Sequence, residues 1–439
     1  MPVKAELARD AALIWMGNQQ RPRWTKELFR PYVVNDYADG HRSWLFDGFI
    51  FLEGNVWNED YSINYTFGEA NLYPAGKQQW SELLDHQLGL DTGNGCKALD
   101  DVIGELIPEL GAPASKHKVI LMMCIPYGYA GNWGSIGDKK IDFAKPADKI
   151  EAMKWYTDQI LERWEKAAFK NIELDGIYWL REAASNYEMD LAKPVTDYAH
   201  EKGLNAYWIP YFNATNFNNW EKMGIDMAYI QPNYFFTTDK PLSRLDDAIN
   251  TAYENEMGLE LEFEGNYVSG YDPVHNVIPQ HNTGLYDVSP VYYQRFVDYL
   301  DKFEEYDVFE FMNLSYYSGY QGVYDFAKST NPKDRKILDR LASHIERRHI
   351  INGWYTPKPA GITDLTVDGR RIAYVDGSNI RIPDRTQGVA VYTTDGRLIY
   401  QEAPAPADFS ITSRGLTIPC QKGIYIVRVG PYTLKLPIL

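Results

Sequence analysis

Two apolar runs of the sequence end in carboxylates. Residues 171–181 lead to Glu182, and residues 258–263 lead to Glu264, with Glu262 two residues earlier on the same face of the run. Glycoside hydrolysis needs one protonated carboxyl group to give a proton to the leaving oxygen and one ionised carboxylate to attack or to activate water. Proximity pushes the pKa values of such a pair apart. We therefore predict Glu182 as the general acid/base and Glu264 as the nucleophile, with Glu262 as its orienting partner or the alternative nucleophile.

Other polar and aromatic residues follow apolar runs in the same way and could bind a sugar. The 33 Tyr and 12 Trp exceed what a core requires, and their flat rings with polar edges are suited to stacking on carbohydrates. The predicted substrate-binding residues are Glu53, Trp57, Tyr127, Trp133, Tyr207, Tyr211, Asn213, Gln231, Asn233, Tyr234, Glu262 and Asn313.

Three functions are compatible with these residues. The first is a glycoside hydrolase that cleaves a poly- or oligosaccharide, the second a glycan-binding barrel without catalysis, and the third a metal-assisted barrel lyase or hydrolase. Metal binding by Glu53, Glu182 and Glu264 is disfavoured because no histidine lies at a predicted strand end. His275 and His281 follow the seventh predicted strand, where a solvated histidine and a substrate contact are both open. We expect no metal and no cofactor.

The elements that must position these side chains alternate between strand and helix. A barrel of eight strands would bring all the carboxyl ends of its strands to one face, where barrel enzymes carry their chemistry. The predicted strands are 11–17, 44–54, 118–127, 171–182, 204–212, 226–236, 258–265 and 308–317, and the predicted helices include 97–110, 148–168, 194–202, 219–223, 242–257, 290–306 and 332–348. The expected fold is a (β/α)₈ TIM barrel over residues 1–355. A doubly wound open sheet is the competitor, but no GxGxxG follows the first strand.

The last part of the chain, residues 356–439, has a different texture. Short alternating runs are separated by Asp-Gly pairs at 368–369 and 395–396, which is a hairpin signal, and a small all-β sandwich is predicted. The runs 391–398 and 422–429 resemble the sorting or accessory β-sandwiches that end many secreted bacterial hydrolases. That resemblance implies export to the periplasm or cell surface, with a signal peptide absent from this sequence.

The stretch Leu174-Asp175-Gly176-Ile177 through Glu182 resembles the catalytic strand of the chitinase family, with Glu182 at the position of its catalytic acid. That family has two aspartates just before the glutamate, where this chain has Tyr178 and Leu180, so substrate-assisted hydrolysis of an N-acetyl sugar is not expected. Carboxylates after the fourth and seventh strands also resemble the large clan of retaining glycoside hydrolases. The barrel as a whole resembles an uncharacterised family encoded with bacterial polysaccharide-degrading systems.

Composition excludes some partners. A net charge of −16 argues against nucleic acid and anionic membranes, which need basic surface, and fits a neutral or cationic partner better. No apolar run is long enough to span a membrane. The three cysteines, Cys96, Cys124 and Cys420, form no CxxC motif, so neither a zinc knuckle nor a disulfide scaffold is indicated. The sugar, its linkage, exo or endo action and the oligomeric state stay open.

Overall fold

The computed structural model divides the 439-residue chain into two compact units, residues 1–356 and 357–439, which are described separately. It describes residues 7–17, 21–38, 40–57, 62–66, 73–126, 133–264, 290–356, 364–367, 370–376, 379–383, 388–393, 397–402, 416–421, 423–429 and 432–438.

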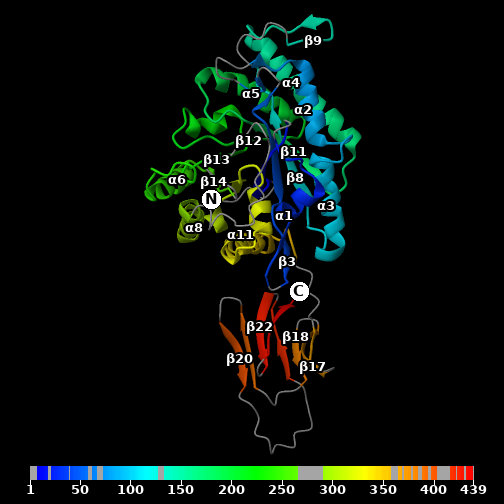
Figure 1. The fold of residues 1–439 in the computed structure, drawn as a ribbon, viewed down its shortest axis with the longest axis vertical. Coiled ribbons are helices and arrows are strands. Elements are labelled where there is room, and N and C mark those ends of the chain that lie inside the picture. The colour runs from blue at the N-terminus through cyan, green and yellow to red at the C-terminus, as the bar shows by residue number, and fades with distance from the viewer. Residues whose placement is uncertain are drawn as a thin grey trace, which may run out of the picture. The chain divides into compact units, whose positions relative to one another are not determined.

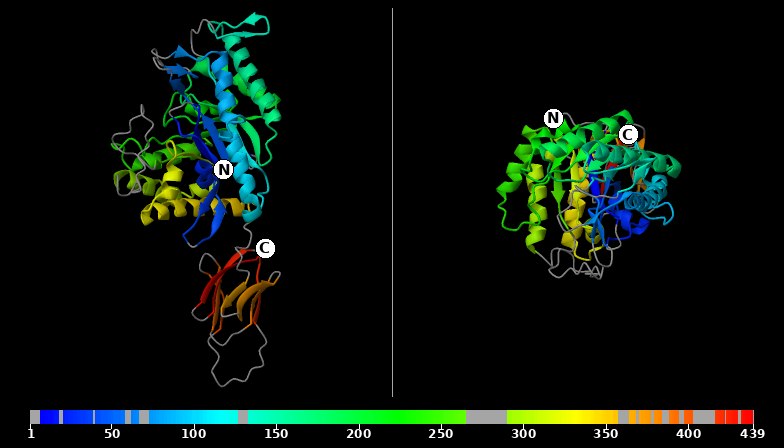
Figure 2. Two further views of the ribbon diagram at one scale, coloured as in Figure 1. Left: turned by 45° about the vertical axis from the view of Figure 1, so that its right-hand side comes forward. Right: turned by 90° about the horizontal axis from the view of Figure 1, so that it is seen from above.

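The first unit is a closed barrel of eight parallel strands surrounded by helices (Figures 1 and 2). The strands in chain order are β1 (Asp10–Trp15), β4 (Gly48–Leu52), β8 (His117–Met123), β11 (Ile172–Trp179), β12 (Asn205–Trp208), β13 (Met227–Ile230), β14 (Gly258–Glu262) and β15 (Leu314–Tyr317). They close in the order β1-β15-β14-β13-β12-β11-β8-β4. The (β/α)₈ barrel predicted from the alternation of apolar runs is therefore confirmed.

Helices cover the outside of this barrel. They are α1 (Lys26–Val33), α2 (Lys77–Leu88), α3 (Gly95–Leu110), α4 (Pro146–Ala167), α5 (Asn186–Glu201), the 3₁₀ helix η1 (Phe217–Met223), α6 (Ser243–Glu254), α8 (Pro290–Glu305), α9 (Val308–Phe311), α10 (Gly322–Lys328) and α11 (Pro332–Ile351). Among the described residues, no helix has both the length and the apolar character needed to cross a membrane.

Smaller sheets lie between these elements. Strand β2 (Val34–Asp36) pairs antiparallel with β3 (Arg42–Trp44), β5 (Asn55–Trp57) and β7 (Tyr73–Pro74) flank β6 (Ser62–Asn64), and β9 (Ser135–Ile136) pairs with β10 (Lys139–Lys140). The expected strand 44–54 is thus divided, since its first residue ends β3 and only residues 48–52 enter the barrel.

The start of the eighth strand is predicted wrongly. Residues 308–311 form the short helix α9, and β15 begins only at Leu314. Asp307 adopts a left-handed conformation with φ 54° and turns the chain into that helix, while Phe309 packs on Phe303 with ring centroids 5.7 Å apart. A short buried apolar run satisfies both a strand and a helical turn, so its composition does not distinguish them.

The two faces of β14 have different roles. Leu259, Leu261 and Phe263 are fully buried, and the Phe263 ring stacks on Phe296 of α8 at 4.4 Å. This face packs on the helices. Gly258, Glu260 and Glu262 take the other face because side chains alternate along a strand. A Cβ atom on Gly258 would lie 2.6 Å from the ring of Tyr229, so the absence of a side chain there lets that ring fill the layer below Glu260.

The second unit consists of two four-stranded antiparallel sheets (orange and red in Figure 1). One has the order β16-β17-β18-β21 and the other β20-β19-β22-β23. Their bounds are β16 (Asp364–Val367), β17 (Arg370–Asp376), β18 (Asn379–Ile382), β19 (Val389–Thr393), β20 (Leu398–Glu402), β21 (Leu416–Pro419), β22 (Gly423–Val429) and β23 (Tyr432–Ile438). Residues of both sheets share one apolar core, for example Ile380 with Val391 and Val427, as expected of a sandwich.

Candidate functional site

The carboxyl ends of three strands are joined by backbone contacts around Glu182. The backbone N–H of Tyr211 donates to the carbonyl oxygen of Glu182 at 3.2 Å, and the N–H of Phe212 donates to the carbonyl of Gln231 at 2.9 Å. The side-chain amide of Gln231 donates to Oε1 of Glu182 at 3.3 Å. Residues after β11, β12 and β13 therefore form one structural group at this end of the barrel.

Glu182 itself is accessible to solvent, yet enough protein surrounds its carboxyl group for desolvation to raise its pKa above the ordinary value. The hydrogen bond from Gln231 and the nearby charge of Arg181 act in the opposite direction. A carboxyl group that is exposed to a ligand and holds its proton more tightly than usual is suited to general acid catalysis.

Glu262 is buried and accepts hydrogen bonds from both side-chain and backbone donors. The backbone N–H of Tyr234 donates to its Oε2 at 3.0 Å, and the hydroxyl of Tyr299 donates to the same oxygen. Burial raises the pKa of Glu262, these two donors and the backbone N–H of Phe235 oppose that rise, the charge of Glu182 adds to it, and the resulting pKa is about 7. Because β12 and β13 separate β11 from β14 in the sheet, this influence acts across the interior of the barrel.

Glu260 lies one layer below Glu262 and is fully buried. Neither of its carboxyl oxygens has a hydrogen-bond partner among the described residues, although the amide of Gln231 is close by. Burial and the charges of Glu262 and Glu182 raise its pKa well above the ordinary value.

Glu264 belongs to a second carboxylate pair. Burial and the charge of Asp325 raise its pKa to about 7, and burial raises that of Asp325 to about 7 as well. Asp325 lies on α10, directly after the loop that follows β15, and Gln321 donates to it at 2.9 Å. The sequence prediction missed Asp325, although its place just after the eighth strand was a usable signal.

Glu53 is paired rather than free. It is fully buried, and Arg21 donates to both of its oxygens at 2.9 Å. The guanidinium carbon of Arg21 lies 4.4 Å from the ring centroid of Trp15 and 4.6 Å from that of Tyr320. Such a bidentate pair between two rings is geometrically fixed. Burial outweighs the opposing effect of Arg21 and leaves the pKa of Glu53 above its ordinary value, while Glu53 raises the pKa of Arg21. Arg21 was not predicted as part of the site.

Some of the predicted aromatic and amide residues lie at the barrel mouth, and others lie outside what the structure describes. Tyr211 and Asn213 are exposed after β12, and Gln231 and Asn233 are half-buried after β13, so these four remain at the barrel mouth. The side chain of Trp57 and the residues Tyr127, His275 and His281 lie outside what the structure describes.

Three further predicted residues are structural in this arrangement. Trp133 is 3 % exposed and packs on Trp80 with centroids 5.1 Å apart, so its faces belong to the core. Tyr207 is fully buried and donates to Asp175. The hydroxyl of Tyr234 donates to Asp298 at 2.7 Å, and only its backbone N–H reaches Glu262.

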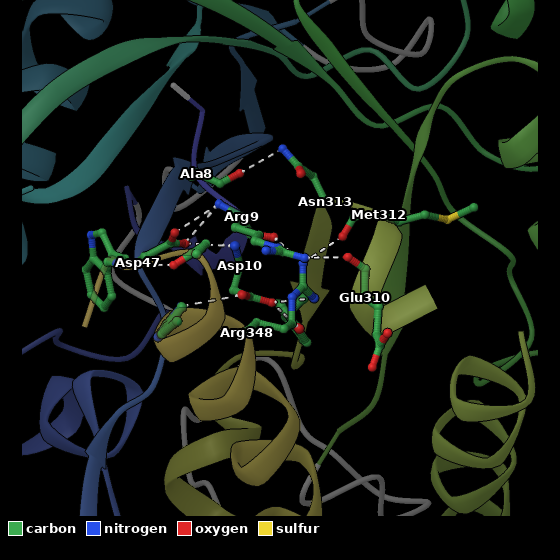
Figure 3. A network of polar contacts seen from close by, with 12 residues as sticks. Ala8, Arg9, Asp10, Asp47, Glu310, Met312, Asn313 and Arg348 are labelled. Carbon is green, nitrogen blue, oxygen red and sulfur yellow. Dashed lines mark hydrogen bonds and ion pairs between the residues drawn. The ribbon is translucent and has the colours of Figure 1, made fainter. Parts of the chain in front are cut away.

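Asn313 is the clearest error of placement. It precedes β15 instead of following it, and its side chain donates to the carbonyl oxygen of Ala8 at 3.3 Å (Figure 3). It therefore lies at the amino-terminal end of the barrel. The mistaken start of the eighth strand displaced this residue from one end to the other.

That amino-terminal end contains a buried polar network (Figure 3). Asp47 accepts backbone N–H bonds from Arg9 at 3.0 Å and from Asp10 at 2.7 Å. Nη1 of Arg348 lies 2.9 Å from Oδ1 of Asp10, and Nη2 donates to the carbonyl of Met312 at 2.6 Å. Desolvation tends to raise the pKa of Asp10, but Arg348 and His349 outweigh it and the net shift is downward.

Ligand atoms of Asp10, Asp47 and His349 lie within 4.8 Å of one another, a grouping that could hold a metal ion. Arg348 already supplies a positive charge to Asp10, and the backbone donors already engage Asp47. The donor set therefore fits a network of the protein's own charges better than a cation site. Polar groups at this end of a barrel contribute to stability, while the opposite end carries the chemistry.

The chain belongs to the family described as a domain of unknown function, DUF4855, whose sequence profile matches residues 10–343. A search of curated proteins finds no match. Similar solved structures include the catalytic domain of a family GH18 chitinase from the fern Peteris ryukyuensis, with 11% identity over 76% of this chain and 99% of that chain and a TM-score of 0.38.

A GH113 beta-1,4-mannanase has 12% identity over 76% of this chain and 99% of that one, with a TM-score of 0.34. A tryptophan synthase alpha-subunit from Pyrococcus furiosus has 10% identity over 77% and 97%, with a TM-score of 0.31. At these identities and TM-scores the similarity carries no conclusion about the activity of this chain.

Proposed function

We propose that this member of the DUF4855 family is a glycoside hydrolase that cleaves a poly- or oligosaccharide with two carboxyl groups at the carboxyl-terminal end of the barrel. Glu182 is the general acid/base. The observation that supports the proposal best is the arrangement of Glu182, which follows β11, and Glu262, which ends β14. The charge of Glu182 raises the pKa of Glu262, and the two carboxyl groups differ in exposure and in hydrogen-bond donors.

The donors favour Glu262 over Glu264 as the second carboxyl group. The N–H of Tyr234 and the hydroxyl of Tyr299 stabilise a negative charge on Glu262 and hold its carboxylate in one position. Glu264 is coupled to Asp325 instead. Glu262 is thus the nucleophile of a retaining mechanism in this proposal, and Glu264, the nucleophile predicted from the sequence, contributes to substrate binding.

The roles follow from what each carboxyl group contacts. Glu182 is accessible from the mouth, so it can give its proton to the leaving oxygen and later take a proton from water. Glu262, ionised and fixed, attacks the anomeric carbon from the opposite side, and hydrolysis of the resulting glycosyl ester returns it to the carboxylate. The exposed Tyr211 and Asn213 are available to the sugar rings.

The first test is a screen of oligosaccharides for new reducing ends with the native protein and Glu182→Gln. Loss of the acid/base is expected to lower turnover of an unactivated substrate by at least about a thousandfold, with the substrate still bound. Unchanged turnover in Glu182→Gln rejects the assignment. Binding without turnover in the native protein makes it a glycan-binding barrel.

The second test identifies the nucleophile. A 2-fluoro glycoside of the sugar found in the screen traps the covalent intermediate, and peptide mass spectrometry locates the label. We expect it on Glu262. A label on Glu264 restores the sequence prediction, and product of inverted configuration by NMR removes the covalent mechanism.

We also propose export to the periplasm or cell surface, on the resemblance of residues 391–398 and 422–429 to accessory sandwiches of secreted hydrolases. Fractionation of the native host with an antibody against the chain checks this. Recovery in the cytoplasm alone contradicts it.

A further inference from the structure

Five carboxyl groups line the carboxyl-terminal end of the barrel, and we call them the acidic mouth: Glu182, Glu260, Glu262, Glu264 and Asp325. Within the described part of the chain none of them forms an ion pair with Lys, Arg or His, whereas the neighbouring Glu53 is paired with Arg21. The mouth therefore holds more acidic groups than the protein's own cations neutralise.

Glu260 is the observation that relates this excess of acidic groups to a ligand site. It is fully buried, its two oxygens have no partner among the described residues, and it lies with Glu182 and Glu262 inside the barrel. An unpartnered carboxyl group in a protein interior is costly. Its place beneath two catalytic carboxyl groups indicates that the mouth is built to meet positive charge from outside.

The pair Glu264 and Asp325 has surroundings suited to an ammonium group. The charge of Glu264 acts on the half-buried Tyr317 and on Tyr32, which is buried and whose hydroxyl hydrogen-bonds with Ser318 at 2.9 Å. Gly319 has φ 61°, and a Cβ atom there would lie 2.5 Å from Oε1 of Glu264, so only glycine leaves room for this carboxylate. Carboxylates beside aromatic rings bind organic cations through ion pairs and cation–π contacts.

The spacing of the groups favours an organic cation over a metal ion. The only grouping of three ligand atoms within 4.8 Å that the described residues contain is that of Asp10, Asp47 and His349 at the other end. The carboxyl groups of the mouth are too widely spread to converge on one ion in this way. A sugar that carries a charged substituent can meet them one at a time.

Several connections that follow the barrel strands contain no basic residue. The segments that follow β4, β12, β14 and β15, residues 53–76, 209–216, 263–289 and 318–321, contain no Lys or Arg. Two of them, residues 53–76 and 263–289, contain acidic residues such as Glu59, Asp60, Asp272 and Asp287, in addition to those already named, while 209–216 and 318–321 carry no Asp or Glu. In the sequence, two of the eight connections thus add negative charge, and none of these four adds a permanent positive charge.

We propose that the substrate of this site is a glycan with free, protonated amino groups, such as an oligomer of 2-amino-2-deoxy sugars, and that Glu264 and Asp325 bind one of these groups. The inference rests on the proposed function and specifies its substrate class. N-acetylation removes the charge from the nitrogen, so the acetylated glycan loses this interaction.

Calorimetry with the native protein at about pH 7, where the amino groups of the probes and the carboxyl groups of Glu264 and Asp325 are both partly ionised, tests the proposal. The probes are oligomers of glucosamine and of galactosamine and their N-acetylated counterparts. An amine-bearing oligomer is expected to bind at least about tenfold more tightly than its acetylated form, the equivalent of one charged contact. Glu264→Gln and Asp325→Asn are each expected to abolish that preference, because each variant lowers the affinity for the amine-bearing oligomer by more than that for the acetylated form.

Glu201→Gln is the matched control, because Glu201 is an exposed glutamate at the end of α5 and outside the mouth. It should leave the preference unchanged. Equal or weaker binding of every amine-bearing probe overturns the inference, as does a preference that survives both mouth variants or calcium binding that displaces the amine-bearing probe.

The proposed function fails separately. If the native protein hydrolyses only an uncharged glycan, and Glu182→Gln abolishes that hydrolysis, the proposed function is supported and the amine-bearing substrate is rejected. If the protein binds the amine-bearing probes preferentially but produces no new reducing end from any probe, the amine preference is supported and the glycoside hydrolase function is rejected.

Discussion

At the amino-terminal end of the barrel, buried carboxylates have partners supplied by the protein. Asp10 has Arg348 and the hydroxyl of Tyr316, and Asp47 has backbone donors. At the carboxyl-terminal end, neither Glu260 nor Glu264 has a hydrogen-bond donor among the residues that the structure describes, while Glu262 has only neutral donors. Similar acidic groups thus serve stability where their charge is compensated inside the fold and are available to a ligand where it is not.

The largest effect on stability should come from breaking the amino-terminal network. Arg348→Met leaves the buried Asp10 without its main cation, and loss of one partner of a buried pair costs about 3–5 kcal/mol. Urea unfolding measures this. Arg347→Met, which breaks the exposed pair with Glu310, is the control and should cost at most about 1 kcal/mol. Equal losses in the two variants would show that the network contributes no more than a surface pair.

At the carboxyl-terminal end of the barrel, removal of a buried carboxyl group is expected to raise the free energy of unfolding. Glu260→Met replaces an unpartnered buried carboxyl group by an apolar side chain of similar length, and removal of that desolvation cost should stabilise the fold by about 1–3 kcal/mol. Urea unfolding again gives the value. Destabilisation would mean that Glu260 has a partner in the folded protein, and the contrast between the two ends would fail.

The stability contributed by the two ends of the barrel should depend on pH in opposite directions. Glu262, Glu264 and Asp325 have folded-state pKa values of about 7, above the unfolded values of 4.5 and 3.8, so their contribution is complete below the unfolded pKa and is lost as pH rises toward 7. The pKa of Asp10 is lowered, so its contribution is present above 3.8 and is lost on further acidification.

Thermal unfolding between about pH 4 and pH 7 measures this loss of stability, with the native protein compared with the double variant Glu264→Gln, Asp325→Asn. The native protein should lose stability from about pH 4.5 to 7, and the variant should lose less. Identical slopes would contradict the raised pKa values.

The smallest expected effect is a shift of a catalytic pKa. Tyr299→Phe removes a donor that stabilises ionised Glu262, so the pKa of Glu262 should rise, and the ascending limb of kcat/KM with its pKa of about 7 should move to higher pH. A limb in this region that descends instead would make Glu262 the acid and Glu182 the nucleophile. An unmoved limb would remove Glu262 from the pH dependence.

The sequence predicted the parts of this comparison that depend on local pattern. Apolar runs with carboxylates at their ends located β11 and β14 and put Glu182, Glu262 and Glu264 at one end of the barrel, since parallel strands share a direction. The run 308–317 failed at its start because burial of an apolar segment leaves the choice between helical turn and strand to tertiary packing.

The partners of these groups could not be predicted because they come from distant segments. Arg21 is 32 residues from Glu53, and Tyr299 is 37 residues from Glu262 and on an outer helix. Which aromatic rings face the mouth also depends on packing between elements, and so the buried Tyr207 looked equivalent to the exposed Tyr211.

The backbone bonds after β11, β12 and β13 have a consequence for how this family can diversify. Main-chain groups of residues 182, 211 and 231 hold the strand ends together, so the backbone position of the acid/base does not depend on the side chain of Tyr211. Asn213 and Asn233 adopt left-handed backbone conformations, with φ 61° and 52°, and these favour Asn or Gly at both positions. An evolving or engineered descendant could therefore acquire a new sugar preference at position 211 while Glu182 stays in place.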